Sequence, residues 1–110
     1  MLIDFASLPE TTIPRMYGGE GEVHANMYAS PAMKIMKGKL PPGATIGLHT
    51  HQTSSEIIYI LSGTGKALSQ GQTELLAPGS CHYCPKGKDH SLINDSDGDL
   101  VFFAVVPEQG

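Results

Sequence analysis

The stretch Leu48–Gly63, LHTHQTSSEIIYILSG, holds two histidines one residue apart and a glutamate shortly after them. Side chains two positions apart lie on the same face of a strand, so His49 and His51 point to one side if this segment is extended. Glu56 follows a short polar turn, and the strand that it opens can bring its carboxylate back beside the two imidazoles. The pattern predicts a polar cluster on adjacent strands.

The rest of the chain also predicts strands. Short apolar pieces alternate with Gly, Pro and polar turns, and no apolar stripe has the period of a helix. The expected strands are residues 22–29, 33–40, 44–51, 56–61, 65–69, 73–77, 80–84, 91–94 and 100–106. This spacing predicts an all-β sandwich or barrel in a single domain, residues 23–110. Residues 1–22 are expected to form an N-terminal arm, because Pro9, Pro14 and the GGEG run interrupt any regular pattern.

Composition excludes several classes of protein. The net charge of the 110 residues is −4, the lysines are scattered and Arg15 is the only arginine, so the basic face that nucleic-acid binding needs is missing. No apolar run approaches the roughly 20 residues that cross a bilayer, and the first residues lack the order of a secretory signal. Cys81 and Cys84 are too few for a disulfide scaffold and fit a reducing compartment. We expect a cytoplasmic protein with neither nucleic-acid nor membrane partners.

A third imidazole, His90, stands in PKGKDHSLIN at the start of another expected strand. Three imidazoles and one carboxylate suit a divalent transition metal, because nitrogen ligands favour Zn, Cu, Fe and Ni and the carboxylate extends the range toward Mn. An isolated pair such as His49 and His51 can also be two solvated side chains that lie together by coincidence. The pair alone leaves both alternatives open.

The spacing around the first cluster extends further in both directions. Gly43 is followed by five residues and His49; then come His51, four residues, Glu56, six residues and Gly63.

A second spaced motif surrounds the third histidine. Gly79 is followed by five residues and Pro85; then come one residue, Gly87, two residues, His90, three residues and Asn94. Together the two motifs resemble, position for position, the two motifs of the cupin superfamily, and the resemblance covers roughly residues 33–106.

The resemblance implies a double-stranded β-helix, or jelly-roll barrel, with a metal inside its mouth. It implies that the metal ligands are His49, His51, Glu56 and His90, and that each chain holds one divalent ion, with Mn, Fe, Zn and Ni all open. Similar proteins include decarboxylases, dioxygenases, isomerases and lyases. We therefore expect an enzyme that converts a small carboxylate, keto or sugar-acid metabolite; the alternative is a non-catalytic sensor that acts with a separate partner.

An enzyme of this kind also needs a proton-transfer group beside its substrate. In the expected strand 80–84, His82 and Cys84 share one face and Cys81 and Tyr83 share the other. Which pair faces the barrel interior stays open from the sequence. His82 is the candidate we favour as the catalytic acid or base, with Tyr83 behind it.

The strand that begins at Glu56 is apolar on both faces. Ile57, Tyr59 and Leu61 form a stripe opposite Ile58 and Ile60. Strands that are apolar on both faces are covered on both faces, and a second subunit is the natural cover for the outside of a small barrel. We therefore predict a homodimer.

Overall fold

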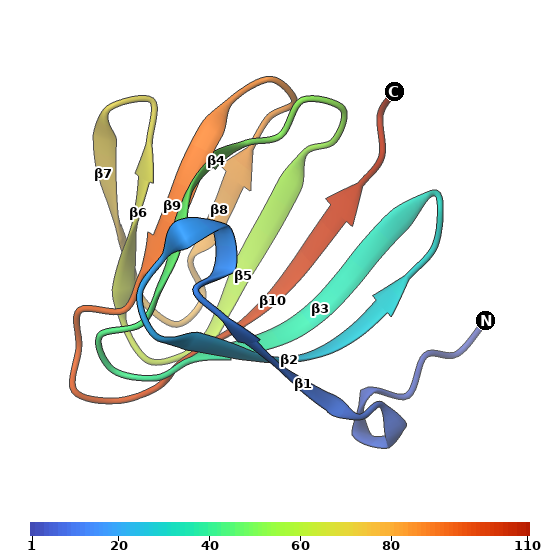
Figure 1. Ribbon diagram of the computed structural model, residues 1–110, viewed down its shortest axis with the longest axis horizontal. Helices are drawn as coiled ribbons and strands as arrows, with labels where there is room; N and C mark the ends of the chain where they lie inside the picture. Colours follow the sequence, from blue (N-terminus) through green and yellow to red (C-terminus); the bar gives the residue numbers. More distant parts are fainter.

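The computed structural model describes residues 1–110 and consists almost entirely of antiparallel strands (Figure 1). No helix has the length and apolar character needed to cross a membrane. The elements are, in chain order, η1 (Phe5–Ser7), β1 (Glu10–Pro14), η2 (Met16–Gly18), β2 (Glu22–Ala29), β3 (Met33–Leu40), β4 (Thr45–Thr50), β5 (Glu56–Ser62), β6 (Gly65–Ser69), β7 (Gln72–Leu76), β8 (Cys81–Cys84), β9 (Asp89–Ile93) and β10 (Leu100–Pro107).

The strands form two sheets that enclose one core. The larger sheet has the order β1-β2-β3-β10-β5-β8, and the smaller has the order β4-β9-β6-β7, with the β6–β7 hairpin at the left of Figure 1. The last strand, β10, is central to the larger sheet because it pairs with both β3 and β5: Ala104 lies opposite Met36 on one side and Ile58 on the other. The predicted all-β jelly-roll barrel is confirmed.

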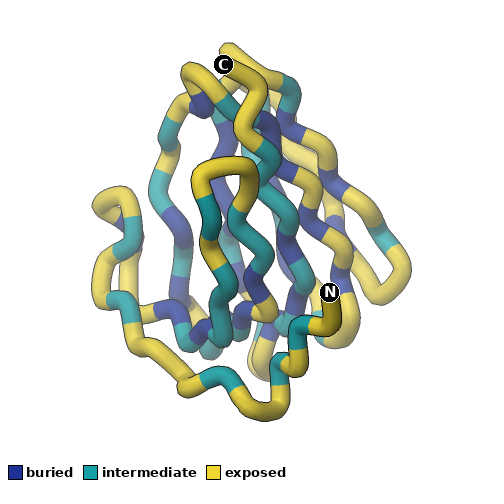
Figure 2. Tube along the Cα trace, turned by 90° about the vertical axis from the view of Figure 1, so that its right-hand side faces the viewer, coloured by how far each residue is buried: buried dark blue, intermediate teal, exposed yellow.

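The alternation of side chains along each strand decides which face lies inside. In β5, Ile58 and Ile60 are buried, whereas Ile57, Tyr59 and Leu61 are 39%, 45% and 43% exposed on the outer face. The same alternation of buried and exposed positions runs along the strands in Figure 2. The buried apolar residues form one cluster, namely Val23, Ala25, Met36, Leu40, Ala44, Ile46, Ile58, Ile60, Ala67, Leu76, Leu92, Leu100, Phe102 and Ala104.

Part of the segment predicted as an irregular arm is a strand. Residues 10–14 form β1, which pairs with β2 of the same chain through a register that places Thr12 opposite His24. The run of threonines and Ile13 suits an extended backbone, and Pro14 is tolerated because it lies at the end of an edge strand. After this strand, η2 turns back against β4 (Figure 1).

Candidate metal centre

Three elements bring the four predicted ligands together. His49 lies in β4 and His51 directly after it, Glu56 is the first residue of β5, and His90 lies in β9. Strands β4 and β9 are paired with His49 opposite His90, so these two imidazoles emerge side by side on the inner face of the smaller sheet. The turn after β4 then returns the chain to the larger sheet, where Glu56 faces them.

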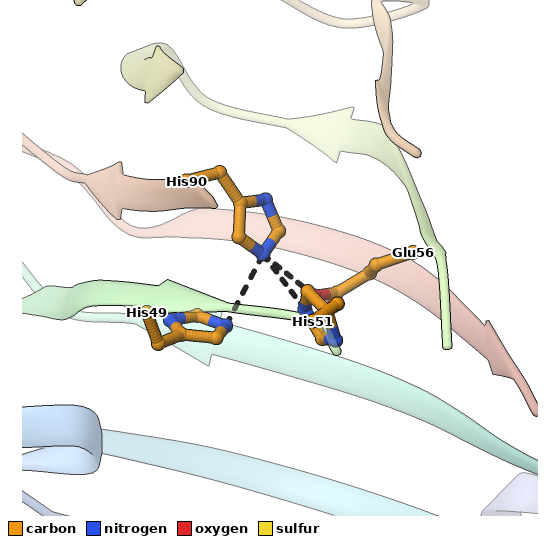
Figure 3. A group of neighbouring side chains, drawn as sticks. All are labelled: His49, His51, Glu56 and His90. Carbon is orange, nitrogen blue, oxygen red and sulfur yellow. Dashed lines mark hydrogen bonds and ion pairs between the residues drawn. The ribbon is translucent and has the colours of Figure 1, made fainter. Parts of the chain in front are cut away.

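The donor atoms converge on the ring of His90 (Figure 3). Its Nε2 lies 3.0 Å from Nε2 of His51, 3.2 Å from Nε2 of His49 and 3.0 Å from Oε1 of Glu56. Nε2 of His51 lies 2.9 Å from the same carboxylate oxygen. One ring nitrogen carries at most one proton, so these contacts cannot all be hydrogen bonds at once. A cation at their centre satisfies all of the lone pairs together.

The separations fit a transition metal. Metal–nitrogen bonds of about 2.1 Å at right angles place neighbouring donor atoms roughly 3.0 Å apart, which matches the four contacts. All four candidate donor atoms lie within 4.8 Å of one another. Three nitrogens and one carboxylate oxygen also leave coordination positions for a further ligand in a six-coordinate ion. The cluster therefore has the donor set and the spacing of a metal site.

Each imidazole is held from its other nitrogen. Nδ1 of His49 donates to the carbonyl oxygen of Gly47 at 2.7 Å, and Nδ1 of His51 contacts Oγ of Ser54 at 3.0 Å. Nδ1 of His90 contacts Nε2 of His82 at 3.0 Å. Partners of this kind orient a ligand ring and hold its Nε2 toward the metal.

Burial and contacts within the cluster change the pKa values of His49 and Glu56. Burial lowers the pKa of His49 and outweighs the hydrogen bond to the Gly47 carbonyl, which raises it; the neighbouring His90 and His51 add to the lowering. Burial alone would raise the pKa of Glu56, but the His51 and His90 imidazoles beside the carboxylate lower it to about 2. The site therefore presents a carboxylate and a neutral His49, the protonation states that bind metals.

A cavity of about 250 Å³ opens above the cluster, and all four residues line it. This volume lies below the ~300–1,000 Å³ of pockets for drug-sized ligands, so the cavity suits a small molecule. Its buried walls beside the cluster are apolar and consist of Met36, Ile46, Ile58 and Leu92.

Tyr17 also lines this cavity, and no sequence pattern indicates its place there. Its ring stacks on His49 with centroids 3.8 Å apart and planes 9° from parallel. Tyr17 has a positive φ of 53°, which is rare outside glycine. The close approach also depends on Gly47, because a side chain there would collide with the carbonyl oxygen of Tyr17. Neither feature has a sequence pattern that would have revealed it.

The two residues predicted as catalytic lie elsewhere. His82 and Cys84 are the pair that faces the interior, and Cys81 and Tyr83 face outward. His82 is 2% exposed and lies behind His90, so it does not line the cavity. Tyr83 is 57% exposed on the outer face of the larger sheet and is not brought to the cluster.

Comparison with known proteins identifies the class to which this fold and site belong. A family model described as Cupin domain matches residues 36–106. The chain belongs to the cupin family. An oxalate-binding protein from Thermotoga maritima is 34% identical over 112 residues, which cover 96% of this chain and 93% of that protein. An uncharacterized protein from Methanocaldococcus jannaschii is 31% identical over 72 residues, which cover 66% of this chain and 58% of that protein.

Solved structures share the same barrel. The crystal structure of a predicted oxalate decarboxylase from Thermotoga maritima has a TM-score of 0.91 and 32% identity, with 98% of this chain and 99% of that chain covered. The cupin domain of Schizosaccharomyces pombe Cnp3 has a TM-score of 0.80 at 12% identity, with 99% and 74% covered. The second likeness concerns the fold alone.

Proposed function

We propose that this protein binds a small carboxylate at one divalent transition metal held by His49, His51, Glu56 and His90. The observation that carries the proposal is the convergence of these four donor atoms in the lining of a small cavity. The metal, when bound, supplies open positions that attract oxygen ligands and polarise them. The proposal covers Mn, Fe, Zn and Ni, because all four accept mixed nitrogen and oxygen donors.

The chain itself contributes one positive charge to the cavity. Lys34 is the single Lys or Arg among the lining residues, it is half-buried, and it makes no ion pair within the chain. An unpaired ammonium in a partly apolar cavity favours an anionic ligand. Ser30 and the exposed Glu108 line the cavity together with Lys34.

Oxalate is the first ligand to test, because the Thermotoga maritima relative is described as an oxalate-binding protein. We expect calorimetric titration to show that oxalate binds to metal-loaded protein and not to metal-free protein. Equal binding by the two forms would contradict the proposal, since it would place the ligand away from the cluster.

Conversion of the ligand is the second candidate function. Decarboxylation of oxalate releases carbon dioxide and takes up one proton to give formate, so an enzyme needs a proton donor beside the ligand. Tyr17, Lys34 and Glu108 line the cavity outside the cluster and are the candidates for this role. A role for His82 in catalysis would have to pass through His90. Formate production by metal-loaded protein tests this candidate, and oxalate binding without formate favours the non-catalytic function.

A further inference from the structure

A chain of three hydrogen-bonded side chains runs from the protein surface to the candidate metal centre. Oε1 of Glu74 lies 2.7 Å from Nδ1 of His82, and Nε2 of His82 lies 3.0 Å from Nδ1 of His90. The carboxylate side chain is 49% exposed, whereas His82 is 1% exposed at its side chain. This series of hydrogen bonds therefore begins in solvent at Glu74 and ends inside the barrel at His90.

The contact between Glu74 and His82 joins the two sheets. Glu74 belongs to β7, the edge strand of the smaller sheet, and His82 belongs to β8, the edge strand of the larger one. No backbone ladder connects these two strands.

The direction of the hydrogen bonds follows from the chemistry of the first group. An ionised carboxylate only accepts, so Nδ1 of His82 must donate to Glu74. A neutral imidazole has one N–H, so Nε2 of His82 then accepts and Nδ1 of His90 donates to it. The remaining nitrogen of His90, Nε2, is left with a free lone pair. This is the nitrogen that points at His49, His51 and Glu56.

We propose that Glu74 and His82 are positioning residues that fix the tautomer and ring orientation of His90 for metal binding. The proposal rests on the proposed metal site. Metal-binding histidines commonly donate their second N–H to a carboxylate or carbonyl. His49 follows that pattern through the carbonyl of Gly47. At His90, the N–H of Nδ1 is accepted by the imidazole of His82, which in turn donates to the carboxylate of Glu74 at the surface.

Substitution of Glu74 tests the proposal, because its exposed position makes the variants tolerable for folding. Glu74→Gln keeps an oxygen that can accept the hydrogen bond. Glu74→Lys offers only donors, so it forces Nδ1 of His82 to accept, reverses both bonds and leaves the proton of His90 on Nε2.

The matched control is Glu22→Lys. Glu22 is also 49% exposed at its side chain and also contacts a histidine, His24, at 3.4 Å. His24 does not belong to the cluster, so this variant makes the same change in charge away from the candidate site.

We measure the affinity of metal-free protein for Zn²⁺ by competition with a chelator, and its unfolding midpoint without metal. We expect Glu74→Lys to weaken Zn²⁺ binding by about 10–100-fold relative to Glu22→Lys, the range typical of lost partners of metal ligands. Glu74→Gln should recover most of the affinity.

Equal affinities for Glu74→Lys and Glu22→Lys would overturn the inference while leaving the metal site intact. A lower unfolding midpoint for Glu74→Lys with unchanged affinity would also overturn it, because the pair would then serve only to join the sheets. Failure of the wild-type protein to bind Zn²⁺ would instead refute the proposed function, and this inference with it.

Discussion

The ring of Tyr17 lies flat on the imidazole of His49, with centroids 3.8 Å apart and planes 9° from parallel. The stacking joins a turn near the N-terminus to a candidate metal ligand in β4. Tyr17 is 55% exposed, so its ring forms part of the cavity wall while its outer side meets solvent. The N-terminal segment is thereby part of the site, although the family model begins only at residue 36.

Removal of the Tyr17 ring should destabilise the turn that packs on His49. We expect Tyr17→Ala to lower the free energy of unfolding of the metal-free protein by about 0.5–1.5 kcal/mol, the contribution of an aromatic pair. Tyr17→Phe keeps the ring and the strained backbone, and it should match wild type. Urea unfolding measures both, and equal stability of the two variants would show that the stacking does not hold the turn.

Acid should destabilise the metal-free protein through Glu56. The pKa of this carboxyl is lowered from 4.5 to about 2 in the folded state. A lowered pKa gives stability that is complete above pH 4.5 and is lost as the pH falls toward 2. The loss amounts to about 3 kcal/mol for a shift of this size. The free energy of unfolding, measured against pH across this range, should fall by this amount in wild type and not in Glu56→Gln. Parallel pH dependences of the two proteins would contradict the prediction.

We propose that the exposed stripe of Ile57, Tyr59 and Leu61 lies in a homodimer interface. Tyr59→Glu would bury an unpaired charge there, at a cost on the order of 3 kcal/mol, and should dissociate the dimer. Leu75→Glu is the matched control, because Leu75 is 84% exposed on the other sheet. Sedimentation at micromolar concentration measures the outcome. A monomeric wild-type protein would refute the proposal, as would equal dissociation of both variants.

Lys34 should contribute to the binding of an anionic ligand. We expect Lys34→Gln to weaken oxalate binding to metal-loaded protein by about 5–10-fold, the loss of roughly 1 kcal/mol from one charged contact. Lys37→Gln removes an exposed lysine of the same strand that does not line this cavity, and it should leave the affinity unchanged. Calorimetry at constant ionic strength compares the two. Equal losses would mean that only the net charge matters.

Much of the barrel follows from local sequence patterns. The alternation around Ile58 and Tyr59 predicts both the strand and its two faces, because a period of two is a property of the extended backbone. The spacing of His49 and His51 predicts a shared face for the same reason. The strand at residues 10–14 escapes prediction, because its order comes from pairing with β2 and not from its own short pattern.

The contacts that complete the site depend on tertiary structure. The sequence pairs His82 with Cys84 on one face, but it does not tell which face lies inside. Glu74 meets His82 across two sheets, and Tyr17 reaches His49 through an unusual backbone conformation. Such contacts join segments whose separation in the chain carries no periodic signal.

Elemental analysis of protein purified without chelator tests the central claim most directly. We expect about one divalent transition metal ion per wild-type chain and an equal content in His24→Ala, which removes a histidine outside the cluster. His51→Ala and Glu56→Gln, measured on folded protein, should lose most of the metal. Full metal content in these two variants, or a wild-type protein that takes up no metal after incubation with Mn²⁺, Fe²⁺, Zn²⁺ or Ni²⁺, would contradict the account.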